Sequence, residues 1–286
     1  MSSLRQIKRR MKSIENIHEI TKAMEMIAAF RFKRAENRFS KSRTYFLEIE
    51  RLISNLSNAS VNFHDPLFEK RQIRRKALVV VTADKGLCGS YNANLLRRAL
   101  GWLNENKAVE AFLAPVGKIG VDFFSKRRVP MLASFPEKSR ADFEMARNMT
   151  EQLKAFFLQG KVDSIEILYT TFRVGVQGKI KLAPFLSLDR LLKNSAGEKK
   201  VTDYIYEPNF AEVFSPLLSR FMEGEMYGVL LESLTSEYAA RMAAMKQATE
   251  NGEEVLDSLK LLRNKTRQAT ITRELSEIVS GASVLV

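Results

Sequence analysis

The stretch that decides the fold is residues 4–56, LRQIKRRMKSIENIHEITKAMEMIAAFRFKRAENRFSKSRTYFLEIERLISNL, which holds neither glycine nor proline. Apolar side chains recur in it at alternating steps of three and four residues, the spacing that places them on one face of a helix. Just before it, Ser3 stands three residues ahead of Gln6, as in a capping box. We therefore expect one helix from about Leu4 to Leu56, roughly 80 Å long.

The recurring apolar positions form a heptad seam, the pattern of a helix that packs lengthwise against another. Its members are Leu4, Ile7, Met11, Ile14, Ala28, Phe32, Ala35, Phe39, Ser42, Phe46, Ile49, Ile53 and Leu56. Between Ile14 and Ala28 the seam positions are polar, namely His18, Thr21 and Glu25. Apolar residues move instead to Ile17, Ile20, Met24 and Ile27, as a three-residue stammer would move them. The sequence therefore predicts that the seam rotates around the helix at this interruption.

A second long helix is predicted in residues 207–286. It starts either after Glu207-Pro208 or at Ser215-Pro216, since proline suits the first helical position. From Asn209 to Leu285 it would be roughly 115 Å long. Gly224, Gly228 and Gly252 each cost about 1 kcal/mol relative to alanine, so this helix needs a partner. The obvious partner is the first helix, running antiparallel. If the residue numbers of facing positions add to about 265, Met24 lies opposite Arg241.

Residues 58–206 change to alternating strands and helices. Strands are predicted at 76–82, 109–116, 165–172 and 179–188, and helices at 92–104, 118–125 and 142–159. The glycines of 173–178 suit a hairpin or short loop between the last two strands. This alternation predicts a mostly parallel sheet covered on both faces. The fold class is therefore α/β with long helices, and the expected domains are 1–57, 58–206 and 207–286.

The chain carries a net charge of +13. Basic residues outnumber acidic ones by 13 to 6 in 1–57 and by 25 to 15 in 58–206, whereas 207–286 has 8 against 12. Such an excess indicates an acidic partner, which could be nucleic acid, an anionic membrane or an acidic protein surface. A lone cysteine, Cys88, excludes an intrachain disulfide framework. No apolar run approaches the roughly 20 residues that span a bilayer, and no signal peptide is evident, so we expect a soluble chain.

The segment Asp84 to Ser90, DKGLCGS, follows a strand and precedes a helix, where an open α/β sheet can hold a phosphate. It matches neither GxGxxG nor GxxxxGK[ST], which favours a tight turn that binds nothing. A nucleophilic Cys88 would need a nearby histidine, and the chain has only His18 and His64, so a small buried thiol is favoured. Candidates for catalytic residues, a cofactor site or metal ligands are lacking.

A basic cluster at the start of the chain could track a phosphate backbone. Seam residues are interleaved with it and no aromatic residue stands nearby, which favours a solvated or acid-facing protein surface. Its members are Arg5, Lys8, Arg9, Arg10 and Lys12.

Unequal helix lengths leave one helix end free. The C-terminal helix is longer by roughly twenty residues, so about 30 Å of it should project past the first helix. This projection contains Arg267, Gln268 and Thr272 and has no charged residue after Glu277. Because an apolar end in water invites aggregation, a partner should cover it.

Four separated motifs resemble the gamma subunit of F-type ATP synthases. They are ITKAMEMIAA at 20–29, TADKGLCGSYN at 82–92, SEYAARM at 236–242 and NKTRQATITRE at 264–274. The resemblance covers the whole chain. It implies an antiparallel left-handed coiled coil of both termini plus a central Rossmann-like open α/β domain. It also implies the role of a non-catalytic central rotor shaft, which couples proton flow to ATP synthesis and hydrolysis and regulates ATPase activity.

The resemblance also implies contact residues and partners. Contacts with the catalytic ring would be made by Met24, Arg241, Arg267, Gln268 and Thr272. The apolar tip would comprise Leu275, Ile278 and Val279, and the foot would use Tyr204, Tyr206 and Glu207 to contact the membrane ring and the epsilon subunit. Implied partners are three alpha and three beta subunits, epsilon and the membrane c-subunit ring. The implied location is peripheral, on the cytoplasmic side of a bacterial inner membrane.

Two other hypotheses compete with the rotor. A coiled-coil nucleic-acid or chromosome-organising protein would bind DNA in a salt-sensitive way. A nucleotide-dependent α/β enzyme would bind its ligand at Asp84 to Ser90. The rotor hypothesis predicts instead co-purification with nucleotide-binding subunits and no nucleic acid.

Overall fold

The computed structural model describes residues 4–59, 67, 71–138, 141–173, 178–185 and 210–283 of the 286-residue chain. The chain forms two compact units. The first comprises Met1–Ala29 and Arg241–Val286, and the second comprises Phe30–Ala240. Both long helices contribute to each unit. The domains expected from sequence, 1–57, 58–206 and 207–286, are consecutive segments of the chain rather than compact units, and they stay a prediction.

The two predicted long helices are confirmed. Helix α1 spans Leu4–Ala59 and helix α6 spans Phe210–Ser283, which is 56 residues against 74. Of the two predicted starts for α6, the one at Ser215-Pro216 is wrong, because Pro216 lies inside the helix. A proline in the second turn removes one backbone donor, and the helix tolerates it. The proposed cap Ser3 and the residues just before Phe210 lie outside the described residues.

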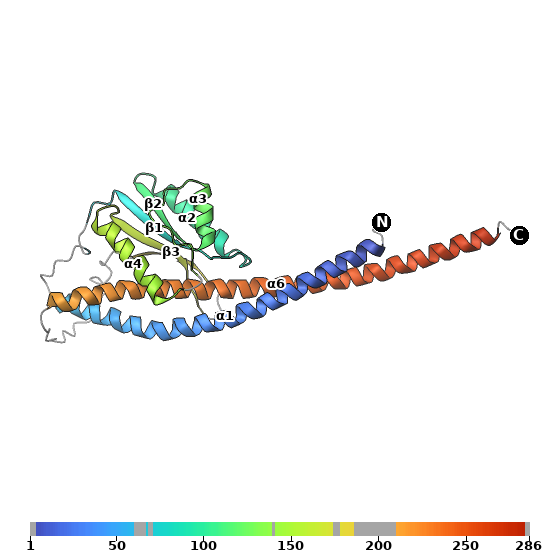
Figure 1. Cartoon of the computed structure of the whole chain (residues 1–286), viewed down its shortest axis with the longest axis horizontal. Helices are drawn as coiled ribbons and strands as arrows, with labels where there is room; N and C mark the ends of the chain where they lie inside the picture. The colour runs from blue at the N-terminus through green and yellow to red at the C-terminus, as the bar shows by residue number, and fades with distance from the viewer. Residues whose placement is uncertain are drawn as a thin grey trace. The chain divides into compact units, whose positions relative to one another are not determined.

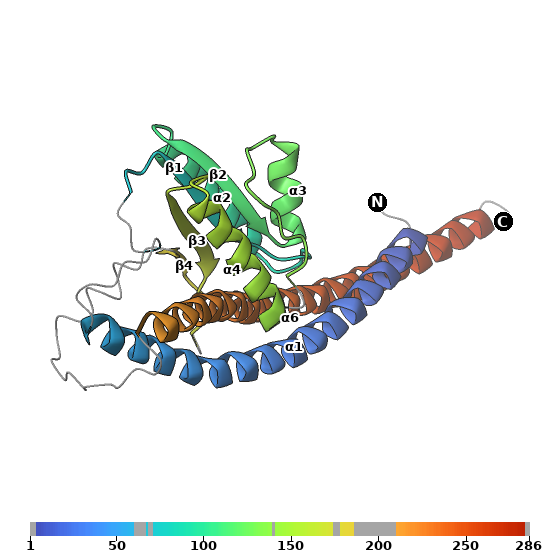
Figure 2. The same cartoon turned by 60° about the vertical axis from the view of Figure 1, so that its left-hand side comes forward.

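A four-stranded sheet forms the centre of the second unit, in the order β2-β1-β3-β4. Figure 1 labels the first three of these strands, and Figure 2 labels all four. Strands β1 (Arg75–Val81), β2 (Glu110–Val116) and β3 (Ser164–Thr170) run parallel, and β4 (Ile180–Pro184) is antiparallel to β3. The predicted mostly parallel sheet is thus confirmed. Strand β4 is shorter than expected, and residues 186–188 of its predicted range are not among those described.

Helices cover both faces of the sheet, as the alternation of strands and helices predicted. Along β1, Ala77, Val79 and Val81 pack with α1, α4 (Phe143–Leu158) and α6. Leu78 and Val80 point the other way, toward α2 (Tyr91–Glu105) and α3 (Lys118–Lys126). Figure 2 shows α2 and α4 on opposite faces. Because successive side chains of a strand point to opposite faces, one apolar run supplies two cores.

Hydrogen bonds near the two ends of α4 link it to α1 and α6. Asp142 caps it by accepting a hydrogen bond from the Met145 backbone N–H at 2.8 Å. On α1, the Arg38 guanidinium donates to the Ala141 carbonyl at 2.7 Å. Lys154 of α4 donates to the Ser219 hydroxyl of α6 at 3.1 Å. These contacts place α4 next to both α1 and α6 on that face of the sheet.

Gly117 joins β2 to α3 and offers a test of this packing. Its φ is +88°, and a Cβ added there would lie 2.5 Å from the Thr82 carbonyl oxygen. We expect Gly117→Ala to lower the free energy of unfolding by about 3 kcal/mol, from backbone strain and this clash together. Gly160 has a φ of +66° with open space around it, so Gly160→Ala should cost only about 1 kcal/mol. Equal losses in urea titrations of the two variants would contradict the close approach at Thr82.

Candidate functional site

Two contacts set the antiparallel register of α1 and α6 in the first unit. The Thr249 hydroxyl donates to the Thr21 hydroxyl at 3.0 Å. A Cβ at Gly252 would lie 3.7 Å from the His18 Cβ. In both pairs the residue numbers add to 270, so the predicted register near 265 is wrong by five residues. That error corresponds to a shift of about 7.5 Å along the helices.

The predicted rotation of the seam is also wrong. The polar residues His18, Thr21 and Glu25 are half-buried, whereas Ile17 and Ile20 are 48% and 59% exposed. The heptad seam therefore runs straight through the interruption. It can do so because Thr21 and Thr249 bond to each other, and His18 packs beside Gly252. Of the apolar residues expected in the seam, Ile17, Ile20 and Ile27 form an exposed apolar stripe instead, and Met24 is half-buried.

Met24 and Arg241 are both half-buried in the first unit. The observed register places Met24 level with Lys246 rather than with Arg241. Met24 lies at the edge of the apolar stripe, whose exposed members are Ile17, Ile20 and Ile27. The sequence placed these residues in the seam, whereas in the structure Ile17, Ile20 and Ile27 face outward.

The end of α6 carries the predicted polar contact residues. In the observed register, Leu4 at the start of α1 is level with Thr266, so α6 continues alone from about Arg267. Figure 1 shows this end of α6 beyond the start of α1. Arg267, Gln268 and Thr272 are exposed, and the Thr272 hydroxyl donates to the Gln268 carbonyl of its own helix at 3.0 Å. Their remaining polar atoms face solvent.

The predicted apolar tip follows on the same helix. Leu275, Ile278 and Val279 are 57%, 68% and 67% exposed. An ion pair between Arg273 and Glu277, at 3.6 Å, runs along this segment. Three large apolar side chains so exposed at helical spacing indicate a surface that a partner covers. The other predicted contacts, Tyr204, Tyr206 and Glu207, lie outside the described residues.

A basic band surrounds the start of α1. All five members of the predicted cluster, Arg5, Lys8, Arg9, Arg10 and Lys12, are exposed. Across the register, α6 adds Lys260, Arg263, Lys265 and Arg267. Of these, Lys260 pairs with Asp257 at 2.8 Å. So dense a set of cations from two helices suits an acidic protein surface or a phosphate backbone.

The turn at Asp84 to Ser90 is held by its own side chains. The Asp84 carboxylate accepts hydrogen bonds from the backbone N–H groups of Lys138, at 2.9 Å, and Lys118, at 3.3 Å. Cys88 is buried, as predicted, and its sulfur accepts a hydrogen bond from the Asn92 amide at 3.2 Å. Asp84 thus joins three segments of the sheet and its flanking helices α2, α3 and α4, which together are called the α/β unit below.

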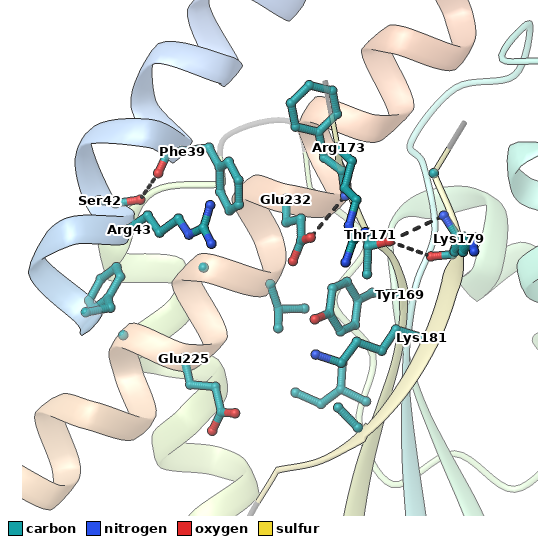
Figure 3. Close-up of a pocket in the computed structure, with 18 of the residues that line it drawn as sticks. Phe39, Ser42, Arg43, Tyr169, Thr171, Arg173, Lys179, Lys181, Glu225 and Glu232 are labelled. Carbon is teal, nitrogen blue, oxygen red and sulfur yellow. Dashed lines mark hydrogen bonds between the residues drawn. The ribbon is translucent and has the colours of Figure 1, made fainter. Parts of the chain in front are cut away.

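A cavity of about 770 Å³ lies between α1, β3, β4 and α6 in the second unit. Figure 3 shows the side chains of Arg43 and Glu232 projecting into it from α1 and α6. Burial raises the pKa of Glu232, although the Phe172 backbone N–H and the Lys181 ammonium oppose this rise. Apolar side chains, together with basic side chains of α1 and β4, form much of the remaining wall of the cavity. Sequence analysis did not single out this cavity.

A buried polar network lies on another side of α6. The Lys138 ammonium pairs with the Glu237 carboxylate at 2.7 Å, and their side chains are 0% and 6% exposed. Lys138 also donates to the Tyr91 hydroxyl at 3.3 Å, and that hydroxyl is 2.6 Å from the Ser233 hydroxyl. Burial alone would lower the pKa of Lys138, but Glu237 and Tyr91 outweigh it and raise the pKa. Lys138 therefore stays charged.

Sequence reasoning missed this network. The signal was present in residues 231–238, LESLTSEY, where Ser233, Thr235, Ser236 and Glu237 interrupt an apolar helix. All four are buried in the structure. Lys138 gave no signal, because its partner is about a hundred residues away in sequence.

Two kinds of site do not occur in the described part of the chain. No cluster of three or more potential metal-ligating side chains is found there. Within the same residues, no helix has the length and apolar character needed to cross a bilayer. The surfaces above are suited to binding other proteins.

Comparisons with known proteins agree on one family. A family model described as ATP synthase matches residues 3–285. The ATP synthase gamma chain of Moorella thermoacetica is 38% identical over 288 residues, and the alignment covers 100% of both chains. The ATP synthase gamma chain of Protochlamydia amoebophila is 35% identical over 286 residues, again with 100% of both chains covered.

Solved structures share the fold. A chain in the central stalk and c ring of the Tetrahymena thermophila mitochondrial ATP synthase has a TM-score of 0.59 and 25% identity. That match covers 80% of this chain and 99% of that one. A rotor chain of the Euglena gracilis mitochondrial ATP synthase has a TM-score of 0.66 at 20% identity, covering 94% and 98%.

The register offers a direct test by disulfide formation. In the variant His18→Cys with Gly252→Cys, the two Cβ atoms would be about 3.7 Å apart, a separation typical of disulfides. We expect mild oxidation to link α1 and α6 in this variant. The matched control, Met24→Cys with Arg241→Cys, follows the 265 register and should stay reduced. A bridge in the control but not in the first variant, seen by gel mobility, would restore the 265 register.

Proposed function

The chain belongs to the ATP synthase gamma-chain family, and from this premise we propose how its surfaces do the work of a central rotor shaft. A gamma chain couples proton flow through the membrane ring to ATP synthesis and hydrolysis in the catalytic ring. The observation that carries the proposal is the end of α6, which continues past α1 with exposed polar residues and then an exposed apolar tip. Such a helix end fits the inside of a ring.

The faces of the helix pair in the first unit differ from one another. The apolar stripe lies on one side of α1, the basic band surrounds the start of α1, and the end of α6 carries Gln268 and Thr272. Inside a ring of three alpha and three beta subunits, each beta subunit would meet a different face. A ligand shifts a conformational equilibrium only by its differential affinity for the states. Different faces therefore bias the three catalytic subunits toward different states, and rotation exchanges those biases.

The chain itself performs no chemical step in this proposal. Asp84 to Ser90, the segment with the closest likeness to a phosphate loop, uses its acidic side chain to hold backbone N–H groups of its own fold. Bond making and breaking would belong to the alpha and beta subunits. The shaft would contribute binding energy that differs between their states.

The proposed partners come from the family, and the exposed surfaces of the first unit suit them. The basic band faces an acidic segment of the beta subunits, and Arg267, Gln268 and Thr272 hold one beta subunit at a time. Met24 and Arg241 contact the ring lower on the shaft, and the tip residues Leu275, Ile278 and Val279 guide the shaft in the ring. Tyr204, Tyr206 and Glu207 remain the proposed contacts with epsilon and the membrane c ring.

The complex would be peripheral, on the cytoplasmic side of a bacterial inner membrane. Relatives of this chain in Moorella and Protochlamydia, which match it end to end, support a bacterial enzyme. The proposed attachment is indirect, through the c ring, so that the shaft can turn with the ring.

Native mass spectrometry of the affinity-purified chain tests this assignment. We expect one copy of the chain with three alpha and three beta subunits and one epsilon subunit. The basic band also suits nucleic acid, so the same preparation should be titrated with duplex DNA at two salt concentrations. Salt-sensitive DNA binding by a chain that brings down no nucleotide-binding subunits would replace the rotor by the nucleic-acid hypothesis.

The polar residues near the end of α6 give a sharper test. Gln268 and Thr272 are four residues apart, on one face of the helix, and exposed. Replacing both with Leu should leave the helix content of the isolated chain unchanged. Loss of a contact worth about 1 kcal/mol with a beta subunit should lower ATP turnover of the complex about fivefold.

The control for this variant uses another exposed polar pair on the same helix. Gln247 donates to Asn251 at 3.1 Å, again four residues apart. Replacing that pair with Leu introduces the same polarity change elsewhere on α6 and should affect turnover less. Full turnover in an assembled Gln268→Leu, Thr272→Leu complex would show that these residues do not hold the beta subunit.

A further inference from the structure

Polar side chains are buried along one short segment of α6 in the second unit. Ser233 and Thr235 are 0% exposed, and Ser236 and Glu237 are 5% exposed. The neighbouring Leu231, Leu234 and Tyr238 are buried too. A helix usually buries only one stripe of its side chains. In this segment the side chains are buried on every side of α6, so the surrounding structure holds the helix in place here.

Two elements of the α/β unit hold this segment from one side. Lys138, from the segment before α4, pairs with Glu237 at 2.7 Å. Tyr91, at the start of α2, contacts the Ser233 hydroxyl at 2.6 Å and accepts a hydrogen bond from Lys138. Ser233 and Glu237 are four residues apart and so share one side of α6. We name this set of four residues, with the contacts described next, the polar collar.

The end of β3 and the residues before β4 hold the same segment from a second side. The Phe172 backbone N–H donates to the Glu232 carboxylate at 3.0 Å. At Gly178, an added Cβ would lie only 2.5 Å from the Ser236 hydroxyl. Glu232 and Ser236 also share a side of α6, about 100° around the helix from the first pair. The α/β unit therefore grips α6 from two directions.

Polar contacts of this kind can form at only one rotation of α6 about its own axis, which we call its rotational setting. Apolar contacts are not directional, so they select one rotation of a helix less sharply than a buried ion pair does. If α6 turned by one residue, Glu237 would leave Lys138 and both charges would be buried without a partner. That outcome is strongly unfavourable, whereas an apolar pair of the same size could replace the ion pair without loss of stability. The ion pair thus serves orientation more than stability.

We propose that the polar collar fixes the rotational setting of α6 in the α/β unit, so that torque passes between this unit and the shaft helix here. This inference rests on the proposed rotor function and names positioning residues for it: Tyr91, Lys138, Ser233 and Glu237. With the collar intact, a turn of the α/β unit is a turn of α6. Without it, α6 slips relative to the sheet.

The test replaces Lys138 and Glu237 together by Met, which has a similar volume and leaves no buried charge. The assembled complex, reconstituted in vesicles, is assayed for protons moved per ATP hydrolysed. We expect this ratio to fall to about half or less, while the thermal midpoint of the isolated chain stays close to that of the parent. A purely structural role would change the midpoint and not the ratio.

A matched control replaces an exposed ion pair of α2, Arg98 and Glu105 at 3.0 Å, with Met. It should leave the ratio unchanged. Tyr91→Phe removes a hydroxyl of the collar without stranding a charge, and it should lower the ratio by a smaller factor. An unchanged ratio in Tyr91→Phe and in the assembled double variant overturns the collar proposal. Failure of the parent chain to assemble with a catalytic ring would instead overturn the proposed function.

Discussion

The antiparallel register of α1 and α6 determines which side chains of both helices are buried and which remain for partners. In the first unit, Thr21 bonds to Thr249 and His18 packs at Gly252. In the second unit, a Cβ at Gly224 would collide with the Phe46 ring, so the glycine lets the two helices approach. The residue numbers of all three pairs add to 270. This register decides which residues of α1 and α6 face each other and which remain exposed to partners.

Polar and apolar residues exchange their usual places at two points of the helices. In α1, Thr21 lies in the seam while Ile17 and Ile20 face solvent. In α6, the charged Glu237 is buried. An exposed apolar stripe suits a surface that meets other subunits, and a buried ion pair suits a joint that must hold one orientation. Both departures from ordinary burial fit the proposed roles of these residues in a rotating shaft.

Periodicity predicted the elements well, because hydrophobic spacing reports local geometry. The long helices followed from the spacing of apolar residues at three and four. The parallel strands and the covering of both sheet faces followed from the alternation of helical segments with apolar runs such as Ala77 to Val81. The register and the straight seam could not be predicted, since they depend on pairs such as Thr21 with Thr249 that are far apart in sequence. The same holds for Lys138, whose role appears only when Glu237 is beside it. Residue-level roles at Arg267, Gln268 and Thr272 came from resemblance, and the structure adds that these residues are exposed.

The most direct test of the central claim is to watch the chain turn. Lys107 is exposed in the turn after α2, and Cys88 is buried, so a Lys107→Cys variant can carry a single optical probe. With the catalytic ring fixed to a surface, ATP should make the probe rotate in one direction, pausing at three angular positions in each turn. ATP hydrolysis by the complex with a stationary probe would contradict the account.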